Sequence, residues 1–290
     1  MKSLYIFFIY FFIFHVISSK KKRLVNGLHE FNIFLDTETI NRDEEVPSKF
    51  RYKIKKILNN TVDILSTILL SNNTKRITYK SDLSSVCNQF IPYFDENIQK
   101  GGIKADLVLY VLFEKKQKPF ITQGICVTYT KSLRPTFGYI KFSKHFDFDK
   151  YNDDQITTIV LHHLTHLIGF NKKKMEKFTD KIELNSSIVY DEEDEDITFD
   201  DSFLLNDLIF KNKTGYIDVN IKNNEFHWSD NLPFPDYMKE NENNFLISPY
   251  TLSLLDKFKY YVVQLPYLRY DTKTNSYDIR SYLVFDNSLI

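Results

Sequence analysis

Apolar side chains recur at helical spacing over residues 50–70, where isoleucine, leucine and valine stand three or four positions apart. This spacing places them on one face of an α-helix, so we predict a long amphipathic helix with one buried face. Residues 251–260 show the same spacing over a shorter length and predict a second helix. Both helices would bury their apolar faces against a common core.

Residues 152–170 predict a third helix with clear boundaries. Asn152 is a favourable N-cap, and Gln155 three residues later completes a capping-box pattern. Gly169 is placed to end the helix, because glycine adopts the backbone conformations that a sharp exit requires. The stripe expected to face the core consists of Ile156, Val160, Leu164 and Leu167.

Four apolar segments predict strands, at residues 31–35, 105–113, 119–130 and 134–143. The second is apolar almost throughout, which is typical of a central strand buried on both faces. Pro135 confines the fourth to a strand start or a sheet edge, because proline has no N–H to donate. Residues 261–290 alternate between apolar and polar positions around a turn at 273–275, and we expect a closing hairpin there.

The first 19 of the 290 residues have the pattern of a secretory signal, with Lys2 followed by an apolar run from position 4 to position 17. The alternative is an uncleaved membrane anchor, because residues 20–23 are all basic and follow the run directly. Lys plus Arg and Asp plus Glu each number 38, so no net charge favours nucleic-acid binding. We expect a secreted or cell-surface protein.

The chain contains two cysteines, Cys87 and Cys126. In a secreted protein an even count suggests one disulfide. Four N-x-S/T sequons are candidate glycosylation sites, and they begin at Asn59, Asn72, Asn185 and Asn212. Sequons also arise by chance in sequence rich in asparagine, so they support secretion only weakly.

A pair of histidines on the third predicted helix is the chemically informative feature. His162 and His166 are four residues apart, so their side chains project from the same face of the helix, one turn apart. Two imidazoles in this position can reach one tetrahedral Zn²⁺. His227, which Trp228 follows, is a candidate third ligand from a distant segment.

At this point the chain resembles the leishmanolysin family of metzincin zinc metalloproteases. The segment HHLTHLIGF is similar to the family's H-E-x-x-H-x-x-G-F helix, and His227 followed by Trp228 resembles the third ligand after a long insertion. The resemblance implies one Zn²⁺ held by His162, His166 and His227, with Met238 in the methionine turn beneath it. It also implies that Cys87 and Cys126 pair.

The resemblance further implies the fold and its division. We expect an α+β zincin with a mixed N-terminal sheet, a backing helix and the zinc helix, followed by a smaller subdomain with the methionine turn. Residues 24–170 would form the first subdomain, 171–226 the family's insertion and 227–290 the second subdomain. Residues 136–142 would be the edge strand along which a peptide or protein ligand adds a strand.

His163 stands where the family has the glutamate that moves a proton during peptide hydrolysis. A neutral imidazole offers one acceptor nitrogen in place of two carboxylate oxygens. Loss of such an acid–base group typically costs on the order of 10²–10⁴ in rate. Three interpretations stay open for His163: a non-functional replacement, a substitute base or water-positioning group, and an alternative metal ligand.

Three functions are therefore compatible with the sequence. The first is a catalytically impaired protease homologue that keeps the zinc and binds peptides or cell-surface proteins. The second is a slow secreted metalloendopeptidase in which His163 assists water. The third is a secreted structural or adhesive glycoprotein without metal. Zinc content separates the third from the others, and peptidase activity separates the first two.

Overall fold

We describe the fold from a computed structural model of the 290-residue chain. The described residues are 27–72, 76–77, 101–117, 120–128, 134–171, 196–200, 216–222, 225–228, 230, 235–239, 245–258, 260–264 and 269–279.

The largest sheet among these residues has four strands in the order β2-β4-β6-β5. They are β2 (Ile33–Asp36), β4 (Leu107–Glu114), β5 (Ile121–Thr128) and β6 (Pro135–Ser143). β2, β4 and β6 are mutually parallel, whereas β5 runs antiparallel to β6, so the sheet is mixed as predicted. β4 is fully buried from Leu107 to Leu112, which fits its central position.

The prediction that residues 136–142 form the edge strand is wrong. Residues 136–142 belong to β6, which lies between β4 and β5, and β5 forms the edge instead. Pro135 is the first residue of β6, so the missing N–H costs no central ladder bond, and this is the alternative that the sequence had left open.

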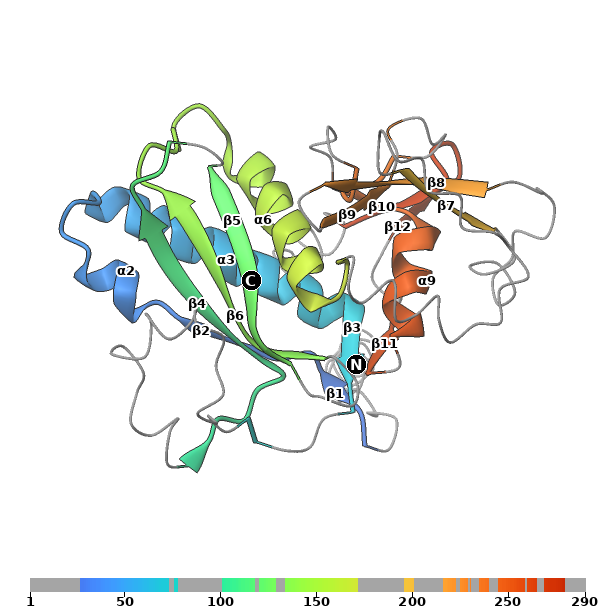
Figure 1. Ribbon diagram of the computed structural model, residues 1–290, viewed down its shortest axis with the longest axis horizontal. Helices are drawn as coiled ribbons and strands as arrows, with labels where there is room; N and C mark the ends of the chain where they lie inside the picture. Colours follow the sequence, from blue (N-terminus) through green and yellow to red (C-terminus); the bar gives the residue numbers. More distant parts are fainter. Residues whose placement is uncertain are drawn as a thin grey trace, which may run out of the picture.

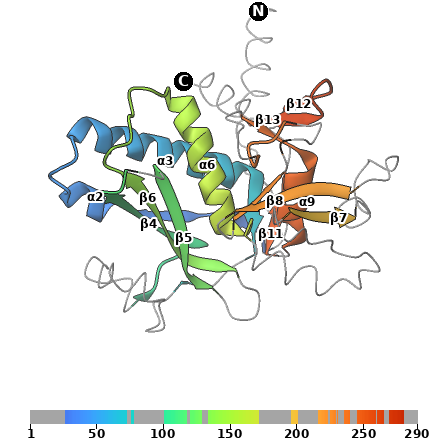
Figure 2. The ribbon, with the colours of Figure 1, turned by 45° about the horizontal axis from the view of Figure 1, so that its top comes forward.

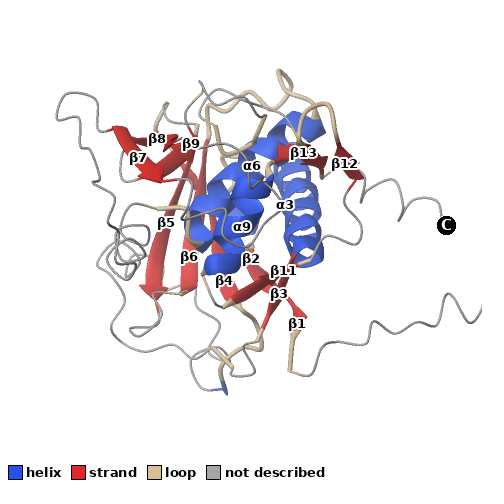
Figure 3. Ribbon diagram, turned by 90° about the vertical axis from the view of Figure 1, so that its right-hand side faces the viewer, coloured by secondary structure: helices blue, strands red, loops and turns tan. Residues whose placement is uncertain are grey.

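Two long helices pack on one side of this sheet (Figure 3). α3 (Ser48–Ile68) buries its apolar stripe, and α6 (Asp153–Ile168) has the capping box predicted from Asn152 and Gln155. α6 approaches β6 closely at Gly138, where a Cβ atom would lie 2.7 Å from Leu167 Cδ1. A side chain at this glycine would push α6 away from the sheet. A short helix, α2 (Glu38–Arg42), follows β2.

The C-terminal part of the chain lies on the other side of α6 from the large sheet (Figures 1 and 2). It contains the helix α9 (Pro249–Lys257), which corresponds to the predicted second helix. One three-stranded sheet has the order β7-β8-β9, formed by β7 (Asp196–Asp200), β8 (Tyr216–Lys222) and β9 (Glu225–Trp228). The fold is therefore α+β, with α6 between the two parts.

The final segment forms the expected hairpin only in part. β12 (Arg269–Asp271) and β13 (Ser276–Asp278) pair around the predicted turn, where Asn275 has a φ of 53°. β13 also pairs with β10 (Leu246–Ile247). β11 (Tyr261–Val263) instead joins β3 (Leu69–Ser71), which pairs with β1 (His29–Glu30), and so ties the two parts of the chain together.

We predict that Gly169→Ala destabilises the protein. Gly169 has a φ of 155°, and a Cβ atom there would lie 2.4 Å from Phe258 Cε2. The backbone strain alone should lower the free energy of unfolding by about 1–3 kcal/mol, and the contact with α9 should add to this loss. Urea unfolding measures it. Gly101→Ala is the control, since nothing lies within 4 Å of its added Cβ. Equal stability of the two variants would contradict the predicted strain and close contact at Gly169.

Candidate metal centre

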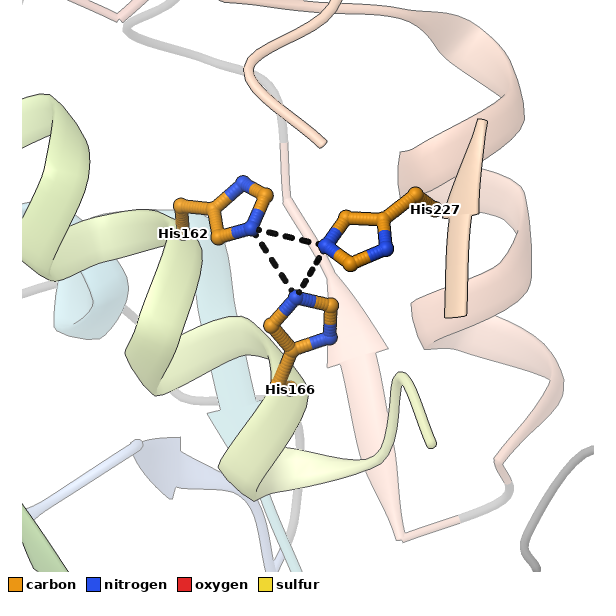
Figure 4. Close-up of side chains that lie close together, drawn as sticks. All are labelled: His162, His166 and His227. Carbon is orange, nitrogen blue, oxygen red and sulfur yellow. Dashed lines mark hydrogen bonds between the residues drawn. The ribbon is translucent and has the colours of Figure 1, made fainter. Parts of the chain in front are cut away.

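Three imidazoles from two distant segments converge beside α6. His162 and His166 project from successive turns of the helix, and their Nε2 atoms are 2.9 Å apart. His227 on β9 places its Nε2 atom 3.1 Å from that of His162 and 3.0 Å from that of His166. Figure 4 shows the three rings pointing their nitrogens at one centre. The structure therefore brings together the three residues that the sequence singled out.

This arrangement fits a zinc ion. Tetrahedral ligands with bonds of about 2.0–2.1 Å lie roughly 3.3 Å apart, close to the separations in this triangle. His166 and His227 are 2% and 4% exposed, whereas His162 is partly exposed, so the centre opens toward solvent on one side. Among the described residues, the three histidines form the group whose ligand atoms are close enough to hold a metal ion.

The tautomers of two rings are fixed by backbone carbonyls. His162 Nδ1 donates to the carbonyl oxygen of Tyr237 at 2.7 Å, and His166 Nδ1 donates to that of Phe170 at 2.7 Å. Because a carbonyl oxygen only accepts, both rings carry their hydrogen on Nδ1 and a lone pair on Nε2. Two lone pairs then face each other at 2.9 Å, an arrangement that a shared cation would stabilise.

A buried carboxylate organises the loop behind the third histidine. Asp236 accepts hydrogen bonds from Met238 N, Ser248 N and Thr251 Oγ1, each at 2.7 Å. Thr251 Oγ1 in turn accepts from Trp228 Nε1 at 2.7 Å. Burial raises the pKa of the Asp236 carboxyl to about 6, although its hydrogen bonds oppose that shift.

Met238 lies beside the strand that carries His227. The methionine is fully buried, and its carbonyl oxygen accepts a hydrogen bond from Trp228 N at 3.1 Å. The family resemblance implies a role for Met238 but none for Asp236, although aspartate is a recognisable turn residue.

The ring of His163 has a side-chain hydrogen-bond partner, whereas those of His162 and His166 bond backbone carbonyls. Its Nδ1 lies 2.5 Å from Gln123 Oε1, and Gln123 Nε2 donates to Glu225 Oε1 at 2.6 Å. Because the carboxylate needs a donor, the amide oxygen of Gln123 faces His163 and the imidazole must donate from Nδ1. Burial, with His162 and His227 nearby, lowers the pKa of His163 to about 3, so the ring is neutral.

Gln123 and Glu225 were not found by sequence reasoning. Both are ordinary polar residues on strands, Gln123 on β5 and Glu225 on β9, and 102 positions separate them. Glu225 also places its Oε2 atom 4.0 Å from His166 Nε2, beside the triangle of ligand nitrogens. No local signal in the sequence indicates this proximity, because it depends on how the two strands pack across α6.

The remaining candidate residues lie away from the histidines or outside the described residues. Cys126 is disulfide-bonded, and Cys87 is outside the described part of the chain. Asn59 and Asn72 are exposed, as a glycan acceptor must be. Asn185 and Asn212 fall outside the described residues.

The sequence model of the peptidase M8 family, leishmanolysin, matches residues 39–194. The chain belongs to the leishmanolysin family. The match contains α6 with His162 and His166, whereas His227 and Met238 lie beyond it. Comparison with individual curated proteins finds no significant match. In the described residues of this leishmanolysin-family chain, no helix has the length and apolar character needed to cross a membrane.

The metal-free protein should lose stability as the pH falls. The pKa values of His163 and His166 are lowered in the folded state, chiefly by burial, while in the unfolded state they return toward the ordinary value near 6.5. Unfolding therefore takes up protons, so the stability from these neutral rings is complete above about pH 6.5 and is lost as the pH falls toward the lowered pKa of each ring, which is about 3 for His163.

Urea unfolding with a chelator, repeated from pH 7 to pH 5, measures this slope. His163→Asn should reduce it by about one proton, or about 1.4 kcal/mol per pH unit. The matched control for replacing a histidine is His145→Asn, at an exposed position. A slope in His163→Asn equal to that of the wild type would contradict a neutral imidazole at position 163 of the folded protein.

Asp236→Asn should weaken the loop behind His227. The asparagine amide cannot accept on both sides as the carboxylate does, so at least one buried donor loses its acceptor at a cost of about 1–3 kcal/mol. Thermal and urea unfolding measure the loss, and Asp256→Asn on the exposed face of α9 is the control. Unchanged stability and an unchanged zinc affinity would show that the carboxylate does not hold this loop.

Proposed function

We propose that this leishmanolysin-family protein binds one Zn²⁺ and takes peptides or proteins as ligands, with peptide hydrolysis strongly weakened. The observation that carries the proposal is the convergence of three imidazole Nε2 atoms at 2.9–3.1 Å from segments 61 residues apart. Surface histidines that merely happen to be close would not be expected to have two tautomers fixed by buried carbonyl acceptors.

In this proposal His162, His166 and His227 hold the ion, and Met238 forms the methionine turn beneath them. When bound, zinc supplies a Lewis acid that polarises a peptide carbonyl and acidifies water. The protein's own residues orient the ligands: Tyr237 and Phe170 hold two of the rings through their carbonyl oxygens. Three ligands from α6 and β9 would also join the two subdomains that we infer on either side of α6.

The proposed peptide site runs along β5. This strand is the end strand of the large sheet, so its outer backbone groups can pair with an added strand. In support of this proposal, the side chain of Gln123 on β5 contacts both His163 on α6 and Glu225 on β9, so β5 passes close to the histidines. An extended peptide on this edge would therefore pass the metal centre.

Weak hydrolysis follows from the residue at position 163. A glutamate there would bring negative charge and two acceptor oxygens, whereas the neutral His163 brings neither. One observation supports slow activity as the second candidate: Gln123 fixes the hydrogen of His163 on Nδ1, so its Nε2 is an acceptor nitrogen. The imidazole could then take a hydrogen from water, although it adds no negative charge.

The remaining expectations belong to the same proposal. Residues 1–19 would be a secretory signal or an anchor, and the protein would act outside the cell or at its surface. The subdomains would span residues 24–170 and 227–290, with the insertion 171–226 between them. Glycans on the four sequons would fit that location.

The decisive variant is His163→Glu. Purified wild-type protein should bind one zinc per chain and cleave generic peptides poorly, and the variant should cleave them about 10²–10⁴-fold faster because the proton acceptor is restored. His166→Ala in the variant background is the control, and it should abolish both zinc and activity. Wild-type activity within tenfold of the variant would instead favour the slow peptidase, and wild-type protein without zinc would exclude both candidates.

A further inference from the structure

Glu225 shares a face of its strand with a metal-binding candidate. Side chains two residues apart on a β-strand point to the same side, so Glu225 and His227 project from β9 toward α6 together. The strand is paired with β8, and Glu225 also forms an isolated bridge with Asn171 just after α6. The backbone beneath this carboxylate is therefore held on both sides.

The two carboxylate oxygens of Glu225 have different surroundings. Oε1 accepts the hydrogen bond from Gln123 Nε2 at 2.6 Å, which fixes the orientation of the group. Oε2 lies 4.0 Å from His166 Nε2, one of the three converging nitrogens. The side chain is 32% exposed, so the carboxylate lies at the open side of the centre.

We propose that Glu225 is the anionic group of the metal centre and supplies from β9 the negative charge that position 163 on α6 does not provide. The inference rests on the proposed zinc binding. The carboxylate oxygens of Glu225 do not belong to the group of mutually close ligand atoms that the three histidines form among the described residues. Glu225 would therefore act next to the ion and not as a fourth ligand.

Two physical effects follow from this placement. A carboxylate near a dication offsets part of its charge, so zinc binds more tightly than three neutral imidazoles alone would allow. The carboxylate also offers an acceptor for a hydrogen of water or of a peptide amide beside the ion. Gln123 is then a positioning residue, because its amide joins the carboxylate to His163 and fixes the direction of both.

The experiment compares zinc affinities by competition with a chelating dye in the full-length protein. Glu225→Gln keeps the size of the side chain and one oxygen that can accept from Gln123, and it removes the charge together with the second acceptor oxygen. We expect one zinc site per chain in both proteins, with affinity about 10–100-fold lower in the variant. The control is Glu114→Gln, the same change at a partly buried carboxylate on β4, which should leave the affinity within twofold.

A second variant separates charge from structure. The double variant His163→Glu/Glu225→Gln carries its carboxylate at position 163 of α6 in place of position 225. If the charge near the ion matters, its zinc affinity should be at least tenfold higher than that of Glu225→Gln. Urea unfolding of the metal-free proteins should be the same for wild type and Glu225→Gln, because the hydrogen bond to Gln123 persists. Recovery with unchanged metal-free stability supports the proposal.

The outcomes are distinguishable from those of the proposed function. Wild-type protein that binds no zinc overturns the proposed function and this inference with it. If wild type binds zinc and Glu225→Gln binds it equally well, the inference alone is overturned, and Glu225 is a structural partner of Gln123. A loss of affinity that the double variant does not recover, or that accompanies a loss of metal-free stability, also overturns the charge role.

Discussion

The structure depends on holding three imidazole nitrogens at one point, and at least two of them present a lone pair. Two of them face each other at 2.9 Å with their hydrogens committed to carbonyl oxygens on the far side of each ring. This geometry is unfavourable without a cation, so a bound cation would stabilise the packing of α6 against β9. The chain around the histidines is arranged to keep the rings in place.

That arrangement comes from packing on both sides of α6. Gly138 lets the helix approach β6, and Gly169 ends it next to Phe258 on the other side. The carbonyl of Tyr237 reaches His162, while the Tyr237 hydroxyl and Thr165 Oγ1 are 2.9 Å apart. Asp236 fixes the same loop to the start of α9. The rings are thus oriented by backbone groups whose own positions are set by buried contacts.

The imidazole at position 163 affects the electrostatics of this site through its hydrogen bonds. His163 is neutral, and through Gln123 it becomes part of a hydrogen-bonded chain that ends at the carboxylate of Glu225. The carboxyl group beside the histidines therefore lies on β9, the strand that carries His227. In this family member the helix α6 supplies two of the three converging histidines, and the neighbouring elements supply the surrounding polar groups.

The sequence by itself determined the elements whose signals are local. Capping by Asn152, the exit at Gly169 and the apolar stripe of α3 depend on neighbours within one or two turns, and each element formed where it was predicted. Helical spacing alone predicts that His162 and His166 lie on the same face of one helix. The prediction that His227 joins them depended on the family resemblance. These features require no knowledge of how distant segments pack.

Tertiary structure alone decided which groups surround the histidines and which strand forms the edge. The sequence of β6 is compatible with an edge strand and with an interior strand, because a proline at the first residue of a strand fits both. Only the pairing of β6 with β5 shows that it is an interior strand. The contact of Gln123 with Glu225 joins residues 102 positions apart, and the Asp236 hydrogen bonds need the loop to close on α9. Such contacts arise from the packing of whole elements, for which short-range sequence patterns carry no signal.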